Sequence, residues 1–277
     1  MHTYETTLPG GARLVGYLRE TTAEMPAYNI RPAVVILPGG GYSHCSNRES
    51  DPVAMRFLAA GYQTFVLYYT VTDLRPGPLR WQPLLDAAGA VLHLRRNAEQ
   101  FHLDPDKIAL CGFSAGGHLA ASAAVLWDQP EIRQALGITG TEARPNAVAL
   151  GYPVITTGAF THEGSTQNLV GEDADLRARM SLENQVRPGL PPFFIWHTVA
   201  DQAVPVQNSL LLANALEACD ISYELHLFAH GDHGSSTCNA EVNTPMPHNA
   251  AWIALCIGWL NETLGFSLDT ASGGPQG

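Results

Sequence analysis

Short apolar runs alternate with longer segments of helical spacing along this chain. Residues 33–37 (AVVIL) and 108–111 (IALC) are continuous apolar runs, which are typical of strands covered on both faces of a sheet. Residues 83–101 carry apolar side chains every three or four positions, as one face of a helix does. The same criteria predict further strands at 12–19, 64–70, 147–152, 193–197 and 223–228, and further helices at 52–60, 115–126, 205–218 and 252–264. This alternation predicts an α/β fold with a mostly parallel central sheet and helices on both of its faces.

The alternation continues over residues 1–269, which indicates a single domain. Residues 158–176 show no strong periodicity, so a segment of about 156–190 is expected to form a small cap over the site. The last residues, 270–277 (TASGGPQG), have the composition of a disordered tail. In open parallel sheets, sites form beyond the carboxyl ends of the strands, and each motif described below falls at such an end.

The sequence carries a formal net charge of −11, and its 15 lysines and arginines are dispersed. An acidic surface without a basic stripe argues against nucleic acid and anionic membranes as partners. No apolar stretch reaches the roughly 18 residues that a membrane span needs, and the N-terminus lacks the form of a secretory signal. The 5 cysteines include no CxxC pair, which favours reduced thiols. We therefore expect a cytoplasmic protein.

Ser114 lies in a Gly-x-Ser-x-Gly pentad (GFSAG, 112–116) between the expected strand 108–111 and the expected helix 115–126. In this strand–turn–helix context a nucleophilic serine sits on a strained elbow, and its small neighbours allow strand and helix to pass closely. A hydroxyl there also lies at a helix N-terminus, where developing negative charge is stabilised. A glycine-rich turn with an incidental serine is the alternative, and the context favours the elbow.

A run of three glycines (PGGGY, 38–42) follows the expected strand 33–37 directly. Consecutive glycines can turn their amides toward a substrate without side chains in the way, and acyl transfer needs such donors for the oxygen that becomes negative. The loop resembles the HGGG-type loop of esterases, with Pro38 where histidine is usual. We expect the amides of Gly40, Gly41 and Ala115 to form an oxyanion hole; a merely flexible turn is the weaker alternative.

An acid and a base that complete such a site follow the serine in the order Asp, then His. Asp201 lies in the loop after the expected strand 193–197, and His233 lies in a glycine-flanked loop after the last expected strand. Both residues would then lie on the same rim of the sheet as Ser114. Asp201 would hold the imidazole of His233, and His233 would take the proton of Ser114 and return it to the leaving group.

Other titratable residues compete for these roles. Asp232 adjoins His233, and His230 lies three residues before it. His226, His230 and His233 together could form a metal site, but the sequence has no HExxH motif. We therefore expect neither a metal nor another cofactor.

The glycine loop and the aperiodic segment supply candidates for a substrate pocket. Tyr42 and His162 are expected to line it. Arg48 and Glu49 fit two interpretations, since they could shape the pocket or form a structural ion pair of the kind common at surfaces. The histidine His197 is expected to be a packing or surface residue.

The motifs together resemble those of the α/β-hydrolases, and more closely those of bacterial carboxylesterases of the acetyl-xylan-esterase-like family, related to the hormone-sensitive-lipase group. The resemblance covers most of the chain and rests on residues 38–54, 112–121, 151–155, 162–171, 191–209 and 224–234. It implies an α/β-hydrolase fold and a catalytic triad of Ser114, Asp201 and His233.

The resemblance also implies a substrate class, namely short acyl esters, acetyl above all, on xylo-oligosaccharides or other small sugars. The absence of a carbohydrate-binding module and of a secretion signal favours small, imported or intracellular esters over polymeric xylan. A homo-oligomer is compatible with the sequence. Two alternatives stay open: a serine peptidase of the prolyl-oligopeptidase type, although 277 residues leave no space for its usual propeller domain, and a ligand-binding member of the fold without activity.

Overall fold

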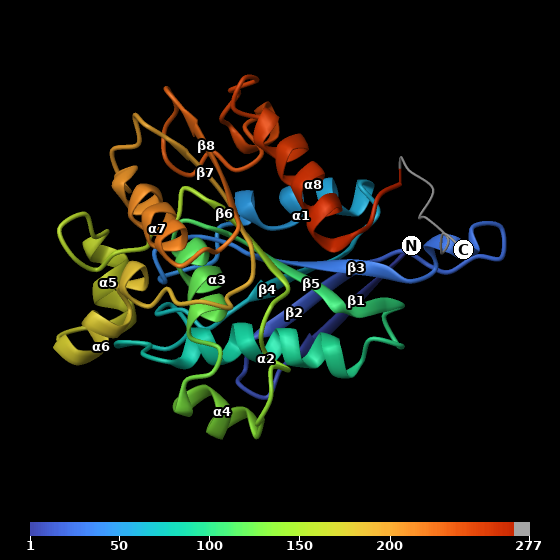
Figure 1. Cartoon of the computed structure of the whole chain (residues 1–277), viewed down its shortest axis with the longest axis horizontal. Helices are drawn as coiled ribbons and strands as arrows, with labels where there is room; N and C mark the ends of the chain where they lie inside the picture. The colour runs from blue at the N-terminus through green and yellow to red at the C-terminus, as the bar shows by residue number, and fades with distance from the viewer. Residues whose placement is uncertain (269–277) are drawn as a thin grey trace.

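A computed structural model describes residues 1–268, and the expected tail at 270–277 lies outside the described residues. An eight-stranded sheet runs through the molecule in the order β1-β2-β4-β3-β5-β6-β7-β8 (Figure 1). The strands β1 and β2 are antiparallel to their neighbours, whereas β4 to β8 and β3 are parallel to one another. The strand bounds are β1 His2–Thr7, β2 Arg13–Leu18, β3 Arg31–Leu37, β4 Gln63–Tyr68, β5 Leu103–Phe113, β6 Ala147–Gly151, β7 Phe193–Thr198 and β8 Tyr223–Phe228.

Helices cover both faces of this sheet, as Figure 1 shows for α1 and α8 on one side and α2 and α4 on the other. The bounds are α1 Asp51–Ala59, α2 Gln82–Arg96, α3 Ala115–Val125, α4 Pro130–Leu136, α5 Glu163–Val170, α6 Ala174–Arg179, α7 Gln207–Ala218 and α8 Ala251–Leu264. Short 3₁₀ helices lie at η1 Pro26–Tyr28, η2 Asn47–Glu49, η3 Leu182–Asn184 and η4 Ala240–Val242. The predicted fold class, a mostly parallel sheet between two helical layers, is confirmed.

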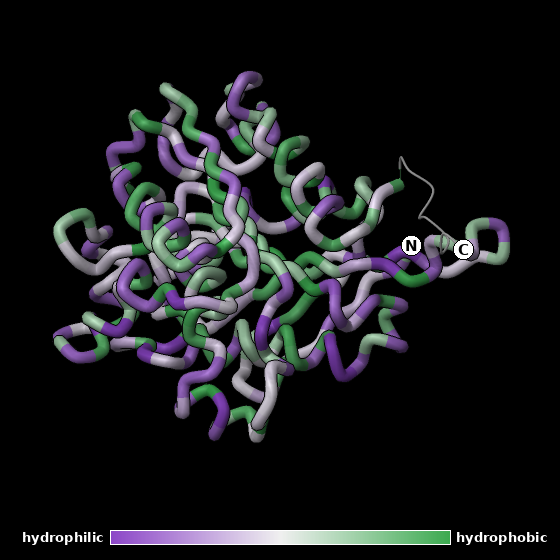
Figure 2. The backbone as a smooth tube through the Cα atoms, viewed as in Figure 1, coloured by the Kyte–Doolittle hydropathy of each residue, from purple (hydrophilic) through white to green (hydrophobic). Residues whose placement is uncertain are grey.

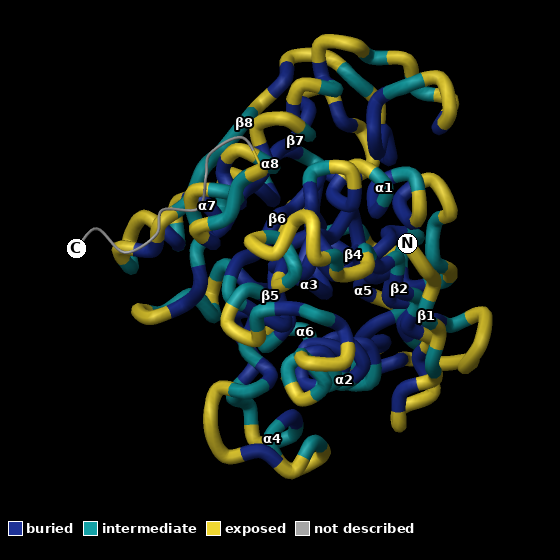
Figure 3. Tube along the Cα trace, turned by 90° about the vertical axis from the view of Figure 1, so that its right-hand side faces the viewer, coloured by how far each residue is buried: buried dark blue, intermediate teal, exposed yellow. Residues whose placement is uncertain are grey.

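The apolar run of β3 shows why the central strands carry no polar positions. Ala33, Val35 and Leu37 pack into the core on the side of α2, α3 and α7, whereas Val34 and Ile36 pack on the side of α1 and α8. Each residue of the strand is buried because both faces are covered. Apolar colour therefore gathers in the central strands (Figure 2), and exposed residues lie mainly in the peripheral loops and outer turns (Figure 3).

Several boundaries differ from the sequence-based expectation. The helix expected over 83–101 ends at Arg96, where Asn97 caps it by donating from its side chain to the His93 carbonyl. The strand β5 begins at Leu103, earlier than expected, because Leu103 pairs with Arg31 of β3 beyond a register shift. The edge strand β1 was not predicted; its side chains are mostly exposed, so no core-facing pattern marks it.

Residues 156–190, expected as a cap, contain α5, α6 and η3. Both helices are shorter than three turns, so neither shows the periodicity on which helix prediction depends. The side chain of Asn168 on α5 donates to the Gly41 carbonyl over 2.8 Å, which places α5 against the glycine loop. In Figure 1 α5 and α6 lie at one end of the molecule, near α3 and α7.

Gly116 allows α3 to approach β3, and we predict that a methyl group there is not tolerated. A Cβ at Gly116 would lie 2.1 Å from the Leu37 carbonyl oxygen and 2.4 Å from that of Pro38, both backbone atoms. Gly116→Ala should lower the free energy of unfolding, measured in urea, by about 3 kcal/mol or more. Gly258 of α8 is the control, because nothing lies within 4 Å of its added Cβ. Gly258→Ala should raise stability by about 0.5–1 kcal/mol; equal effects at the two glycines would contradict this packing.

Candidate active site

Ser114 stands on a strained turn between β5 and α3. Its backbone angles are φ 53° and ψ −120°, a conformation that non-glycine residues rarely adopt. The amide of Ser114 donates to the Gly151 carbonyl at the end of β6 over 3.0 Å, which fixes the turn to the neighbouring strand. Gly112 must be glycine because a Cβ there would lie 2.1 Å from the Gly116 carbonyl oxygen. The predicted strand–turn–helix elbow is present.

The structure brings Ser114, Asp201 and His233 into one chain of hydrogen bonds. His233 Nδ1 lies 2.6 Å from Asp201 Oδ2, and His233 Nε2 lies 2.8 Å from Ser114 Oγ. Because a carboxylate can only accept, the imidazole proton is on Nδ1, and Nε2 accepts from the serine hydroxyl. The serine follows β5, the aspartate follows β7 and the histidine follows β8, so three strand ends meet at one rim.

Asp201 is fully buried at its side chain and has every acceptor position engaged. Its Oδ1 accepts from the amides of Ala203 and Val204, each over 2.9 Å. Burial by itself would raise the pKa of Asp201, but hydrogen bonds from His197, His233 and the Val204 amide outweigh it and hold that pKa well below the ordinary value. The aspartate is therefore a fixed negative charge behind His233.

His197 is a residue that the sequence argument assigned no role in the site. It is fully buried, and its Nε2 lies 3.0 Å from the Val204 carbonyl and 3.3 Å from Asp201 Oδ2. Since the Val204 atom beside Nε2 is a carbonyl oxygen, which can only accept, Nε2 carries the proton and can also donate toward the carboxylate. Ser209 fills the other side of the ring by donating to Nδ1 over 2.7 Å. No sequence pattern indicated this contact, because a four-residue separation brings side chains together on a helix, whereas His197 lies in β7 and Asp201 in the loop after it.

Hydrogen bonds with two neighbouring side chains fix the conformation of the glycine loop. Gly40 and Gly41 have φ values of 123° and 64°, which favour glycine. The Gly39 amide donates to Glu49 Oε2 over 2.7 Å, and the Tyr69 hydroxyl donates to the Pro38 carbonyl over 2.6 Å.

The three amides expected to form the oxyanion hole remain unpaired. Within residues 1–268 the amides of Gly40, Gly41 and Ala115 have no hydrogen-bond acceptor. Gly39, the first glycine of the loop, packs against Ser114, since a Cβ on it would lie 2.9 Å from the Ser114 Cβ. Free donors beside the serine are what an oxyanion hole requires.

Tyr42 does not line an open pocket as expected, because its ring is buried. Its hydroxyl donates to His118 Nδ1 on α3 over 2.8 Å, and His118 Nε2 donates to the Met180 carbonyl over 2.9 Å. Tyr42 thereby anchors the glycine loop to the helix that follows Ser114. The loop lacks the histidine of the HGGG form, and this tyrosine–histidine pair provides one anchor instead.

His162 is half-buried and caps α5. The Ser165 amide donates to His162 Nδ1 over 3.2 Å, so Nδ1 is unprotonated and the proton is on Nε2. A Cβ on Gly41 would lie 4.0 Å from His162 Cε1, which places this ring beside the glycine loop. Burial and the nearby His233 lower the pKa of His162, so it is a neutral donor. Within the described chain its Nε2 has no partner.

Arg48 and Glu49 do not form the ion pair that was one interpretation of them. Glu49 is buried and bonds to Gly39 and Tyr152 instead. The metal interpretation of His226, His230 and His233 is not favoured, since His226 pairs with Glu224. No group of three or more potential ligand side chains within residues 1–268 is arranged for a metal.

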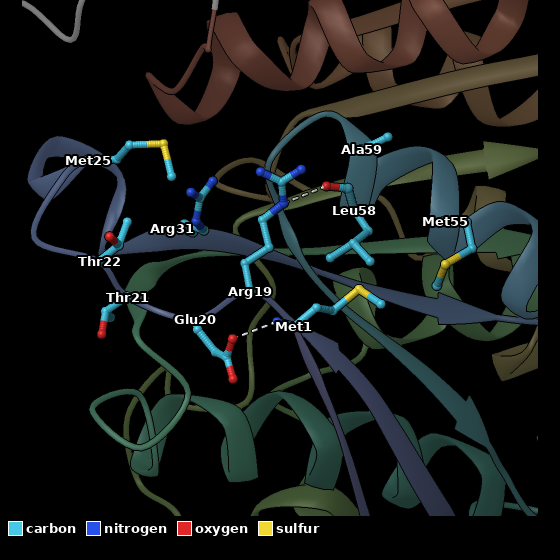
Figure 4. A pocket seen from close by; sticks show the side chains of 10 residues that line it. All are labelled: Met1, Arg19, Glu20, Thr21, Thr22, Met25, Arg31, Met55, Leu58 and Ala59. Atoms are coloured by element: carbon cyan, nitrogen blue, oxygen red, sulfur yellow. Dashed lines mark hydrogen bonds and ion pairs between the residues drawn. The ribbon is translucent and has the colours of Figure 1, made fainter.

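A cavity of about 520 Å³ lies elsewhere, at the amino end of β3, where Arg31 begins the strand (Figure 4). The side chains that line it include Met1, Arg19, Glu20, Met25, Arg31 and Met55. Because Ser114 follows the carboxyl end of the neighbouring strand β5, this cavity is on the opposite edge of the sheet from the candidate site.

The fold and the Ser–His–Asp arrangement at its rim together define an α/β-hydrolase. The BD-FAE family model matches residues 24–216, and the chain belongs to this family. The crystal structure of an acetyl ester-xyloside bifunctional hydrolase from Caldicellulosiruptor lactoaceticus superposes with a TM-score of 0.78 at 35% identity, covering 94% of this chain and 90% of that one. The expected resemblance to bacterial esterases is confirmed.

Two curated relatives are longer than this chain. Endo-1,4-beta-xylanase B of Butyrivibrio fibrisolvens is 41% identical over 219 residues, which are 76% of this chain and 33% of that protein. The acetylxylan esterase of Xylanibacter ruminicola is 29% identical over 232 residues, 81% of this chain and 44% of that protein. The chain thus spans less than half the length of either relative. In residues 1–268, no helix is both long and apolar enough to cross a membrane.

We predict that His118 makes the protein less stable in mild acid. Burial lowers the pKa of His118 to about 4, against its Met180 hydrogen bond, whereas the unfolded chain takes up the proton near ~6.5. Stability is therefore fully present above that value and is lost as the pH falls toward 4, by up to about 3 kcal/mol. His118→Asn should flatten urea-derived stability over this range. His230→Asn, at an exposed site, should keep the wild-type slope; an unchanged slope in His118→Asn would contradict the assignment.

Proposed function

We propose that this chain is a serine carboxylesterase that hydrolyses short acyl esters, acetyl above all, through an acyl-enzyme. The observation that carries the proposal is the continuous chain from Asp201 through His233 to Ser114, with hydrogen bonds of 2.6 and 2.8 Å. Acyl transfer needs a nucleophile, a base, a group that orients the base and a site for the oxyanion. Ser114, His233, Asp201 and the unpaired amides are our candidates for these four roles.

In the proposed mechanism Ser114 Oγ attacks the ester carbonyl carbon while its proton passes to His233 Nε2. Asp201 stabilises the imidazolium that results, and the amides of Gly40, Gly41 and Ala115 hold the oxyanion. The tetrahedral intermediate collapses as the alcohol leaves with the proton from Nε2. Water then repeats the sequence on the acyl-serine: it gives a proton to His233, attacks the carbonyl, and releases the acid and free Ser114.

Small sugar esters, including acetylated xylo-oligosaccharides, are the proposed substrates. The names of two relatives, an acetylxylan esterase and an acetyl ester-xyloside hydrolase, support this class. The half-buried, unpartnered Nε2–H of His162 beside Gly41 fits a sugar hydroxyl next to the ester.

A cytoplasmic location and a small-molecule partner are part of the same proposal. The free cysteines Cys45, Cys111, Cys219, Cys238 and Cys256 suit a reducing compartment. The net charge of −11 disfavours nucleic acid and anionic membranes as partners.

We predict that removing any member of the triad abolishes ester turnover and spares the fold. Ser114→Ala and His233→Ala should lower kcat for p-nitrophenyl acetate by at least about 10⁴-fold, and Asp201→Asn by about 10³-fold or more. Circular dichroism should remain that of the wild type. Near-wild-type turnover by Ser114→Ala would defeat the proposal. Faster cleavage of a matched p-nitroanilide than of the ester would favour the peptidase alternative.

We predict that His162 selects for sugar esters. His162→Asn keeps an acceptor for the Ser165 amide, and thus the helix cap, but removes the Nε2 donor. The KM for acetylated xylobiose should rise about tenfold, the worth of one hydrogen bond. For p-nitrophenyl acetate, which has no sugar hydroxyls, the KM should stay within about twofold. An equal rise for both esters would contradict a role in sugar recognition.

A further inference from the structure

Glu49 is a buried carboxylate beside the candidate site that the proposed mechanism does not use. Its residue is 3% exposed, at the end of η2. A Cβ on Gly39 would lie 2.6 Å from Glu49 Oε2 and 2.9 Å from the Ser114 Cβ, so carboxylate, glycine and nucleophile pack together. A carboxylate in such a place costs stability unless its oxygens are satisfied.

Both oxygens of Glu49 accept hydrogen bonds from parts of the chain that are distant in sequence. The Gly39 amide donates to Oε2 over 2.7 Å, and the Tyr152 hydroxyl donates to Oε1 over 2.6 Å. The Tyr152 oxygen in turn accepts from the Ser236 amide over 2.8 Å, so its own proton must go to Glu49. Because both oxygens act as acceptors, this pattern suits the ionised carboxylate.

We call the hydrogen bonds from Gly39 through Glu49 and Tyr152 to Ser236 the Glu49 bridge. Tyr152 also connects it to His233, the proposed catalytic base. It follows β6 with a φ of 36°, in the left-handed region, and is fully buried. Its ring packs edge-on against the His233 ring with centroids 5.0 Å apart. Ser236, three residues after His233, also donates from its hydroxyl to the Arg48 carbonyl, next to Glu49.

We propose that Glu49 is a positioning residue that, through Tyr152, fixes the oxyanion loop and the His233 loop at one separation around Ser114. Gly39 directly precedes Gly40 and Gly41, and Ser236 lies just beyond His233, so the bridge joins the two loops whose spacing a tetrahedral intermediate must match. The inference rests on the proposed function. It predicts that breaking the bridge weakens transition-state binding more than substrate binding.

Glutamine is the replacement that tests the role of the Glu49 carboxylate most specifically. Its single carbonyl oxygen can accept from Gly39, but its amide then donates to Tyr152, whose hydroxyl proton is left without an acceptor. The volume stays the same, and a buried charge is removed. Burial raises the pKa of Glu49 above its ordinary value, although bonds from Tyr152 and Gly39 oppose the rise. The ionised group therefore costs folding energy, so Glu49→Gln should not unfold the protein.

A kinetic comparison tests the proposal. For Glu49→Gln and Tyr152→Phe we expect kcat for p-nitrophenyl acetate to fall about 10- to 100-fold, with KM within about threefold and the thermal midpoint within about 5 °C of wild type. The double variant should be no slower than the slower single one, because both break one bridge. Additive losses, or a loss of kcat matched by a collapse in thermal midpoint, would indicate a structural role and overturn the proposal.

Asp86 supplies the matched control. It is also a buried carboxylate that accepts a backbone amide, that of Thr70 over 2.8 Å, and burial raises its pKa as well. Asp86→Asn should keep wild-type kcat. A drop equal to that of Glu49→Gln would mean that any buried carboxylate has this effect.

Binding of an alkylboronic acid, which forms a tetrahedral adduct on a serine nucleophile, gives a readout that needs no turnover. Its affinity for Glu49→Gln should weaken by the same factor as kcat/KM. If wild type hydrolyses esters and both proteins bind the boronate equally, the Glu49 proposal alone fails. If wild type neither hydrolyses esters nor binds the boronate, the proposed function fails and the Glu49 proposal with it.

Discussion

The strained turn at Ser114 is the constraint on which the rest of the site depends. With φ 53° and ψ −120°, the turn carries the hydroxyl beyond the rim of the sheet, at a cost of order 1–3 kcal/mol. It forms only because Gly112 and Gly116 let β5, α3 and β3 approach to contact distance. Because helices cover both faces of the sheet, the two packed cores on either side hold this turn in place.

The groups around that hydroxyl follow the ends of different strands, and each is fixed by hydrogen bonds to its own surroundings. Asp201 is held by two amides and by His197, and it holds His233. On the other side, Tyr42 ties the glycine loop to α3 through His118. The three side chains lie within hydrogen-bond distance of one another in this structure, which is the kind of pre-organisation that acyl transfer requires.

The sequence was most informative about functional residues that directly follow the end of a strand. Continuous apolar runs predicted the central strands, and the pentad after one of them located Ser114. The chain order then led to Asp201 and His233, which the structure brings together. The loops between the strands were harder. Nothing in PGGGY indicated that the Tyr42 ring turns inward, because the loop direction depends on the φ of 61° at that residue.

Contacts between segments that are distant in the chain also could not be predicted from the sequence. Glu49 was one of two adjacent charged residues, and its burial became visible only when Gly39 and Tyr152 were seen to bond to it. The helices α5 and α6 are too short to leave a periodic signal and are held by side-chain caps at His162 and Asp173. The local sequence pattern thus predicted the central strands and longer helices, whereas the polar contacts around the site became visible only in the structure.

The most direct test of the central claim is the reaction of the folded protein with a fluorophosphonate, followed by peptide mass spectrometry. The account predicts one adduct, on Ser114, that forms far more slowly in His233→Ala because the hydroxyl has lost its base. An unreactive Ser114 in the folded wild-type protein, or labelling at another serine instead, would contradict it.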